Sequence, residues 1–325
     1  MAAILDIRDL VVHYSSDRET VRAVNGLSLS LERGKVLGLV GETGAGKTTT
    51  ALSVLDMVQE PQGKIVSGTI LFEGRDIRAL RPEEMREVRG KEIAMIFQDP
   101  MTALNPLITV GEQIAETVRR HEGLPREDSE RRAGEMLELV GIPASRSRDY
   151  PHQFSGGMKQ RVVIAIALAC NPKLLLADEP TTALDVTIQA QVLEMMSELI
   201  KKFGTSVVMI THDLGIVAEN CDHVATMYAG EVVEYGTVDQ VFGDPRHPYT
   251  IGLFGSLPNL DEESDRLTPI PGLMPDPTDL PAGCFFSPRC PRATERCQAE
   301  RPSDSEEGGH RVKCHLFGGG KEEGR

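Results

Sequence analysis

The stretch from Gly41 to Thr48, which reads GETGAGKT, limits the fold of this chain more than any other feature. It matches G-x-x-x-x-G-K-[ST], a loop whose backbone N–H groups surround the phosphates of a nucleotide. The apolar run from Val36 to Val40 is typical of a buried parallel strand, and Thr49 to Val58 has the pattern of a helix. A strand, a phosphate loop and a helix in this order predict an α/β core.

Each residue type in the phosphate loop has a chemical reason for its place. Gly41, Gly44 and Gly46 allow backbone conformations that strain other residues, and they let the chain approach phosphate oxygens. Lys47 is expected to reach the β- and γ-phosphates, and the hydroxyl of Thr48 to bind Mg²⁺. The predicted nucleotide contacts here are Gly41, Glu42, Thr43, Gly44, Ala45, Gly46, Lys47, Thr48 and Thr49.

Composition indicates a cytoplasmic protein. The 325 residues carry a net charge of −14, which argues against a partner bound mainly through nucleic-acid phosphates. No apolar run approaches the ~20 residues of a membrane-spanning helix. The first residues, MAAILDIRDL, carry charge where a signal peptide would be apolar. We therefore expect the chain to reach a membrane only through partner subunits.

The pattern changes along the chain. Residues 4–31 alternate apolar and polar as antiparallel strands do, and residues 110–140 are rich in helix with a break near Gly123. From about Asn259 the periodicity is lost, and nine prolines lie between Pro258 and Pro302. We predict a nucleotide-binding domain over 1–258, with a helical subdomain at about 103–165, and an extension over 259–325 that ends in a disordered tail.

Two acids end a second buried strand. Lys173 to Glu179 reads KLLLADE, so the carboxylates follow an apolar run. An acid at a strand end beside a phosphate loop can hold Mg²⁺ or its waters, which is the role predicted for Asp178. Glu179 is then placed to polarise an attacking water as the general base.

A second turn before a long helix suggests another anion site. Ser155, Gly156, Gly157 and Met158 lie in FSGGMKQR, where the positive helix N-terminus can attract an anion. Ordinary helix capping explains the same residues. Because one nucleotide does not need two phosphate sites, we predict that this turn contacts a nucleotide bound to a partner subunit.

Taken together, these motifs resemble the ATP-binding subunit of an ATP-binding cassette (ABC) transporter. The resemblance covers Ile4 to about Gly243, in order and spacing as well as in residues. It implies a cassette with a mixed α/β sheet, an antiparallel β subdomain and a helical subdomain. It also implies a head-to-tail dimer that encloses ATP between the phosphate loop of one subunit and the Ser-Gly-Gly signature of the other. The matching motifs are GETGAGKT, Gln98 in IFQDP, FSGGMKQR, LLLADEP, TTALD ending at Asp185, and His212 in ITHD.

The resemblance also implies roles for single residues. Tyr14 would stack on adenine, His212 would contact the γ-phosphate, and Asp185 would cross the dimer interface. Gln98 would contact Mg²⁺ and the attacking water, where the cassette meets its membrane partner. The signature usually reads Leu-Ser-Gly-Gly-Gln, whereas Phe154 and Met158 stand at its ends here. The expected catalytic residues are Glu179, His212, Gln98 and Lys47, and the expected Mg²⁺ ligands are Thr48, Gln98 and Asp178.

The C-terminal part narrows the family. His247 to Thr250 (HPYT), Ile270 to Gly272 (IPG) and the cysteine segment after them are similar to the extension on ATPases of bacterial dipeptide and oligopeptide importers. Some relatives there carry nickel or other small solutes. The resemblance is to the first-type subunit, which pairs with a related second ATPase. The implied partners are that ATPase, two membrane permeases and, indirectly, an extracytoplasmic solute-binding protein, with no nucleic acid.

Four cysteines lie in the extension. They are separated by five, six and sixteen residues, and four thiolates suit an iron–sulfur cluster or structural zinc. The lack of a C-x₂-C pair weakens zinc, and the resembled group can carry a [4Fe–4S] cluster. Free thiols or a reducible disulfide stay open, and Cys170 and Cys221 are predicted to be packing residues. The candidate ligands are Cys284, Cys290, Cys297 and Cys314.

Two other functions compete with an ATPase that energises peptide import. A soluble ABC-type ATPase acting on DNA or ribosomes would carry long coiled coils or two cassettes, whereas only about a hundred residues separate Lys47 from Ser155 and the cassette is single. A regulatory subunit that binds ATP without hydrolysing it would not need Glu179 and His212.

Overall fold

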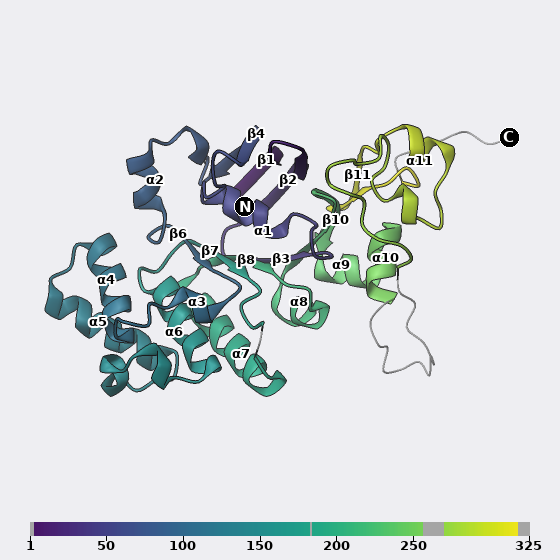
Figure 1. The fold of residues 1–325 in the computed structure, drawn as a ribbon. Helices are drawn as coiled ribbons and strands as arrows, with labels where there is room; N and C mark the ends of the chain where they lie inside the picture. Colours follow the sequence, from purple (N-terminus) through teal and green to yellow (C-terminus); the bar gives the residue numbers. More distant parts are fainter. Residues whose placement is uncertain (1–2, 183, 256–269, 318–325) are drawn as a thin grey trace. The chain divides into compact units, whose positions relative to one another are not determined.

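The computed structural model describes residues 3–182, 184–255 and 270–317 (Figure 1). Contacts between Cα atoms divide the chain into two compact units. The first unit contains Leu31–Val36 and Asp76–Ile210 with the first residues of the chain, and the second contains Leu5–Ser30, Leu37–Arg75 and Thr211–Arg325. Among the described residues, no helix has the length and apolar character needed to cross a bilayer.

The first unit is built on a parallel sheet. Strand β7 (Leu174–Asp178) lies between β6 (Ile93–Ile96) and β8 (Ser206–Ile210), and it is parallel to both. Every residue of β7 and β8 is buried, as expected for parallel strands covered on both faces. Helix α6 (Gly156–Leu168) packs on β6 and on α7 (Val186–Phe203).

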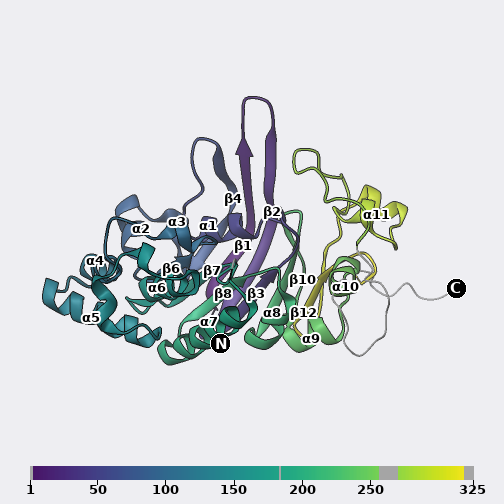
Figure 2. The same cartoon turned by 60° about the horizontal axis from the view of Figure 1, so that its bottom comes forward.

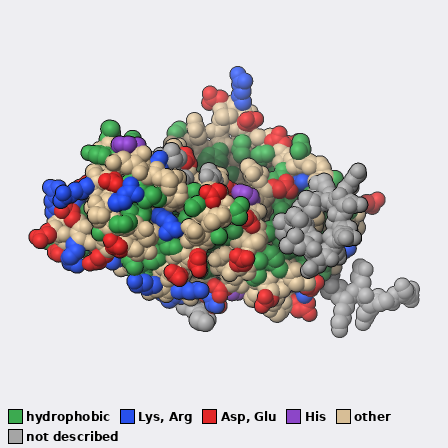
Figure 3. All heavy atoms as spheres, turned by 90° about the horizontal axis from the view of Figure 1, so that it is seen from below, with side chains coloured by type: hydrophobic (Ala, Val, Ile, Leu, Met, Phe, Trp, Pro, Cys, Tyr) green, Lys and Arg blue, Asp and Glu red, His purple; other side chains and the backbone are tan. Residues whose placement is uncertain are grey.

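A helical group follows β6 in the same unit. Helix α4 (Val110–Glu122) ends where Gly123 adopts a φ of 66°, and α5 (Arg126–Leu139) packs against it. Basic and acidic side chains are interspersed on the surface of this region, toward the left of Figure 3. Surface ion pairs such as Arg126–Glu130 add little stability each. The shorter helical pieces after β6 are α3 (Pro100–Ala103) and the 3₁₀ turns η2 (Ala144–Arg148) and η3 (Pro151–Gln153), and α2 (Pro82–Val88) precedes β6.

The second unit contains an antiparallel sheet near the start of the chain. Its strand order is β2-β1-β4-β5, and β1 pairs antiparallel with β4. Figure 2 shows the long hairpin of β1 and β2 with β4 beside β1. The bounds are β1 (Ala3–Ser15), β2 (Thr20–Glu32), β4 (Gly63–Phe72) and β5 (Arg75–Asp76), which the 3₁₀ turn η1 (Ile77–Ala79) follows in the first unit.

The nucleotide motif lies on a second group of strands in this unit. Strand β3 (Val36–Val40) is parallel to β9 (His223–Tyr228), and β9 is antiparallel to β10 (Glu231–Thr237). Their order is β11-β12-β10-β9-β3, so two strands of the C-terminal extension continue the sheet. The remaining elements are α1 (Lys47–Val54), α8 (Leu214–Asn220), α9 (Val238–Gly243), α10 (Pro248–Gly255), η4 (Ser287–Arg289), α11 (Glu295–Ala299), β11 (Asp304–Glu307) and β12 (His310–Lys313).

The extension is less separate from the α/β core than the change in composition indicates. Strand β12 pairs with β10, so that Glu234 lies opposite Val312. The carboxylate of Glu234, a residue only 1% exposed, is 2.8 Å from Nε2 of His310 and also accepts the N–H groups of Arg246 and His247. A buried carboxylate is tolerated only with such partners. The predicted boundaries at 103, 165 and 258 stay predictions, and the predicted disordered tail lies largely outside the described residues.

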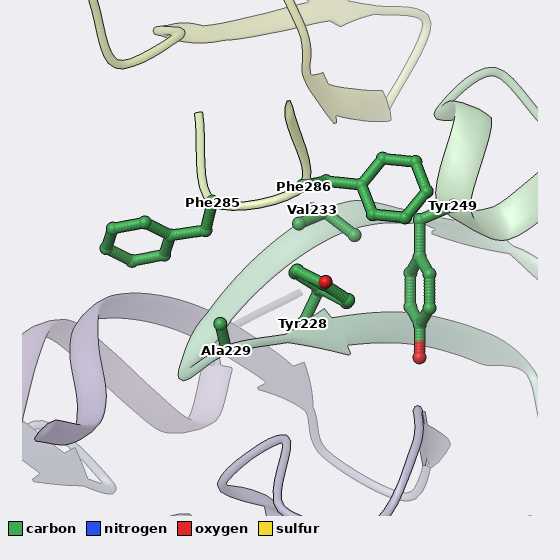
Figure 4. Packing of buried hydrophobic residues seen from close by; sticks show 6 residues of the cluster. All are labelled: Tyr228, Ala229, Val233, Tyr249, Phe285 and Phe286. Carbon is green, nitrogen blue, oxygen red and sulfur yellow. The ribbon is translucent and has the colours of Figure 1, made fainter. Parts of the chain in front are cut away.

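An aromatic cluster fastens the extension to strands β9 and β10. It contains Tyr228, Ala229 and Val233 from this pair of strands, Tyr249 from α10, and Phe285 and Phe286 from the extension (Figure 4). Tyr228 and Phe286 meet edge to face with ring centroids 5.2 Å apart. Such contacts add to the burial of large apolar surfaces, so this cluster stabilises the attachment of the extension to β9 and β10.

Candidate active site

The phosphate loop joins β3 to α1 within the second unit. Gly46 is the residue before α1 and has a φ of 97°. A Cβ there would lie 2.4 Å from the carbonyl oxygen of Ala23, and one on Gly41 would lie 2.3 Å from that of Met227. The glycines are therefore required by close backbone packing as well as by their backbone angles. The first N–H groups of α1 have no partner within the helix and can bind an anion.

Lys47 folds back across the phosphate loop. Its Nζ donates to the carbonyl oxygens of Gly41 at 2.6 Å and of Glu42 at 3.0 Å, and the residue is 8% exposed. These bonds place the ammonium inside the loop. Of the other predicted contacts, Ala45 is buried, Thr49 is half-buried, and Thr43, Gly44 and Thr48 are exposed.

Two further predicted contacts belong to the same unit. Tyr14 lies near the end of β1 opposite Gly63, where a Cβ would come within 2.7 Å of the tyrosine ring. The half-buried ring therefore packs closely on the backbone at the start of β4. His212 follows β8 and is exposed, and Asp213 after it caps α8 by accepting the N–H of Gly215 at 2.9 Å.

The predicted catalytic acids belong to the first unit. Asp178 is the last residue of β7 and is 3% exposed, and Glu179 follows it with a φ of 47°. Positive φ is uncommon outside glycine, so the backbone turns sharply after the strand. One oxygen of Glu179, Oε2, accepts from Nε2 of Gln98 at 3.0 Å and from Oγ1 of Thr182 at 2.8 Å. The structure thus brings Gln98 and Glu179 together, and it adds Thr182.

The signature turn lies at the start of α6 in the first unit. Ser155 accepts the N–H of Met158 at 3.4 Å as the helix cap, and Ser155 and Gly156 are exposed. A Cβ on Gly157 would lie 2.5 Å from Cγ2 of Ile188, so helix α7 packs closely there. Ser155 therefore acts as the helix cap, and the predicted contact of this turn with a partner's nucleotide stays a prediction.

Asp185 has a local role as well. Its carboxylate caps α7 by accepting the N–H of Ile188 at 3.0 Å, while the residue itself is exposed. Its predicted role at a dimer interface stays a prediction.

The four cysteines of the extension influence one another. Burial, with smaller contributions from the neighbouring Cys314, Cys297 and Cys290, raises the pKa of the Cys284 thiol to about 11. The N–H of Cys284 also donates to the carbonyl oxygen of Cys297 at 2.8 Å. Over 3–182, 184–255 and 270–317, no group of three or more His, Cys, Asp or Glu side chains is placed to hold a metal ion. Burial raises the pKa of Cys170 to about 11 and of Cys221 to about 12, which suits packing residues.

Known proteins resemble the chain over its whole length. The family profile of ABC transporters matches residues 24–182, and that of the oligopeptide/dipeptide transporter C-terminal region matches residues 233–297. The chain is 51% identical over 318 residues to the oligopeptide transport ATP-binding protein OppD of Bacillus subtilis, covering 97% of this chain and 89% of OppD. The dipeptide transport ATP-binding protein DppD of Escherichia coli is 47% identical over 317 residues, 97% of each chain. The chain belongs to the ATP-binding subunits of oligopeptide and dipeptide ABC transporters.

Solved structures of ABC cassettes are similar to this chain in fold. The ATP-binding cassette MJ0796, in a dimeric post-hydrolysis state bound to ADP and Pi, superposes with a TM-score of 0.64 at 26% identity, covering 72% of this chain and 98% of that one. CbiO1 from Clostridium perfringens, part of the ABC transporter complex CbiONQ, gives a TM-score of 0.64 at 30% identity, covering 75% of this chain and 92% of that one.

Membership confirms the predicted cassette fold and makes this chain an ATP-binding ABC transporter ATPase. The roles of single residues remain predictions. Sequence reasoning missed the contacts of Glu42, whose N–H donates to the hydroxyl of Tyr249 at 2.9 Å and whose carboxylate pairs with Arg289. The HPYT motif singles out Tyr249 but does not indicate that its hydroxyl binds Glu42. No sequence pattern around Arg289 indicates that it pairs with Glu42.

Proposed function

We propose that this cassette is the ATP-hydrolysing subunit of an importer of dipeptides and oligopeptides. The observation that carries the proposal is the joint match to an ABC transporter profile and to the C-terminal region of oligopeptide and dipeptide transporters. Three relatives named for peptide transport, AppD and OppD of Bacillus subtilis and DppD of Escherichia coli, are 47–51% identical over 97–98% of the chain.

The proposed chemistry is hydrolysis of ATP to ADP and phosphate. A water oxygen attacks the γ-phosphorus, Glu179 accepts the proton of that water, and the bond to the bridging oxygen of ADP breaks. Hydrogen bonds from Gln98 and Thr182 fix one oxygen of Glu179, so the general base is oriented before the substrate arrives. Lys47 and His212 would neutralise charge on the γ-phosphate. Mg²⁺ held by Thr48, Gln98 and Asp178 would supply further charge neutralisation.

We propose that the site is completed by a second cassette. The signature turn, Ser155 to Met158, whose first two residues are exposed, would contact the nucleotide held by the partner's phosphate loop, and Asp185 would lie at the interface. The dimeric state of the MJ0796 cassette supports this arrangement. The proposed partner is a related but different ATPase, and the pair would bind two permease subunits at the cytoplasmic face of the membrane. An extracytoplasmic solute-binding protein would deliver the peptide.

Replacing Glu179 by Gln tests the catalytic assignment. The variant keeps the size and the hydrogen-bonding oxygen, so it should bind ATP as the parent does. Loss of a general base should lower turnover by about 10²–10⁴-fold. ATP binding by the purified chain and phosphate release with and without the membrane subunits are the two measurements. Normal turnover by the variant would refute the role of Glu179, and a parent that binds but never hydrolyses ATP would favour a regulatory subunit.

We also propose that Cys284, Cys290, Cys297 and Cys314 bind a [4Fe–4S] cluster, with zinc as the alternative. Four mutually interacting thiols in a short Pro-rich segment support the proposal, because such a segment needs a cross-link to hold its shape. Burial favours the protonated thiols of Cys284, Cys290 and Cys314, so binding must release protons. The side chains must also rearrange, because no three of the described His, Cys, Asp or Glu side chains are placed to hold a metal ion. A cluster would supply a cross-link among the loops that carry these cysteines.

A further inference from the structure

One acidic residue stands within the phosphate loop itself. Glu42 is the only carboxylate between Gly41 and Thr48, in a segment that must attract a polyanion. Its negative charge opposes the attraction exerted by Lys47. A cation bound to the Glu42 carboxylate would offset this repulsion.

Arg289 of the C-terminal extension supplies that cation. Its Nη1 donates to both carboxylate oxygens of Glu42, at 3.2 and 3.0 Å. The Arg289 side chain is 6% exposed and that of Glu42 is 31% exposed, so the guanidinium is buried and the carboxylate is only partly open to water. Charge-assisted contacts of this kind are stronger than neutral ones, especially when they are partly buried.

The guanidinium of Arg289 is itself fixed. Its Nε donates to the carbonyl oxygen of Pro271 at 2.9 Å, and its Nη2 donates to that of Ile270 at 3.4 Å. The hydroxyl of Tyr228 is 3.5 Å from Nη1, and the guanidinium carbon lies 5.8 Å from the centre of that tyrosine ring. These contacts hold the Arg289 side chain in one orientation within the extension.

The backbone of Glu42 is held from the same side. Its N–H donates to the hydroxyl of Tyr249 at 2.9 Å, and Tyr249 packs on Phe286 with ring centroids 5.5 Å apart. On the other side, the Glu42 carbonyl oxygen accepts from Lys47 at 3.0 Å. Glu42 is therefore held by three residues: Arg289 of the extension, Tyr249, which packs on the extension, and Lys47 of the phosphate loop.

We propose that Arg289 is a positioning residue for ATP binding: it neutralises the carboxylate of Glu42, so that the phosphate loop accepts the triphosphate without an opposing charge. The inference deepens the proposed function, since it concerns the same loop. It makes the extension a structural part of the nucleotide site, although the extension lies more than two hundred residues away in the sequence.

The test compares ATP binding by the full chain and three variants: Arg289→Met, Glu42→Gln and the double variant. Arg289→Met should bind ATP more weakly by on the order of tenfold, the effect of an uncompensated charge at about 10 Å in a medium of dielectric constant about 20. ADP carries less charge and should lose less affinity than ATP. Glu42→Gln keeps the backbone N–H and carbonyl groups of the phosphate loop and removes only the side-chain charge, so it should bind ATP at least as tightly as the parent.

The double variant separates neutralisation from a general structural defect. Because Glu42→Gln removes the charge that Arg289 offsets, the double variant should bind ATP nearly as the parent does. Arg296→Met is the matched control, since Arg296 also precedes a cysteine of the extension but pairs on the surface with Glu300 at 3.0 Å. It should leave ATP binding unchanged.

Two results would overturn the inference: parent-like affinity in folded Arg289→Met, or a double variant as weak as Arg289→Met. If Arg289→Met does not fold, Glu42→Gln still decides, because weaker ATP binding by that variant contradicts neutralisation. A parent chain that does not bind ATP would instead contradict the proposed function.

Discussion

Acid should destabilise the second unit through His247. The imidazole is buried against Phe286, with ring centroids 5.7 Å apart, and its Nδ1 accepts the N–H of Tyr249 at 3.0 Å. Burial lowers the pKa of His247 from 6.5 to about 3. Above pH 6.5 the ring is neutral in the folded and the unfolded chain, whereas below it only the unfolded chain takes up the proton. The free energy of unfolding should fall by about 1.4 kcal/mol per pH unit between pH 6.5 and about 3.

Replacement of His247 by Asn removes this dependence and keeps the cap of α10. The asparagine oxygen can accept the same backbone N–H but does not titrate. At pH 7.5 the variant should be less stable by about 2 kcal/mol, because the ring contact with Phe286 is lost. At pH 5.0 the parent has lost about 2 kcal/mol through His247 and the variant has not, so the difference should nearly vanish.

Urea unfolding at pH 7.5, 6.0 and 5.0 measures both effects. Far-UV circular dichroism is the suitable signal because the chain has no tryptophan. The control is Phe286→Leu, which weakens the same packing but retains the histidine. The stability of this variant should therefore decrease as the pH is lowered, as that of the parent does. A constant difference between parent and His247→Asn at all three pH values would refute the burial argument.

Three further predictions follow from the geometry. Gly46→Ala should lower both stability and ATP affinity, because its Cβ would lie 2.4 Å from the Ala23 carbonyl oxygen. A Cβ on Gly44 would have nothing within 4 Å, so Gly44→Ala should cost only about 1–2 kcal/mol of backbone strain. Thermal unfolding and ATP titration of the two variants measure the difference. Thr182→Val removes one hydrogen bond to Glu179, and such a bond contributes about 1–1.5 kcal/mol. The variant should therefore have a kcat about tenfold lower and an unchanged ATP affinity. Equal losses in kcat and in ATP affinity would contradict the role of Thr182 in orienting the general base. The parent chain purified without oxygen should contain iron and sulfide, and the Cys314→Ser variant should contain neither. Iron, sulfide and zinc analysis measures this. Zinc without iron in the parent would exclude the cluster.

The local parts of the site could be predicted from the sequence. The phosphate loop, the acids at the end of β7 and the helix start at Ser155 depend on residues within one strand, turn or helix, so short-range patterns reveal them. The resemblance then placed Gln98 and Glu179 at one reaction, and the structure brings their side chains within 3.0 Å. The positive φ of Glu179 left no trace in the sequence, because nothing marks a non-glycine residue for that conformation.

The long-range parts could not be predicted. Glu42 and Arg289 are 247 positions apart, and neither has a neighbour pattern that indicates the other. The Pro-rich composition of the extension likewise concealed strand β12, because only four residues pair there and their register depends on β10. Buried partners such as Glu234 and His310 become recognisable only when both strands are in place.

The short strands of the extension have a consequence for association between molecules. Without β12, the outer side of β10 would offer free N–H and C=O groups on which a strand of another molecule could form. With the extension in place, the outermost described strand is β11, whose sequence DSEE contains three acids in four residues. Like charges on so short a strand oppose addition of a further strand. A cassette shortened before residue 259 should therefore be prone to aggregate even where its core still folds.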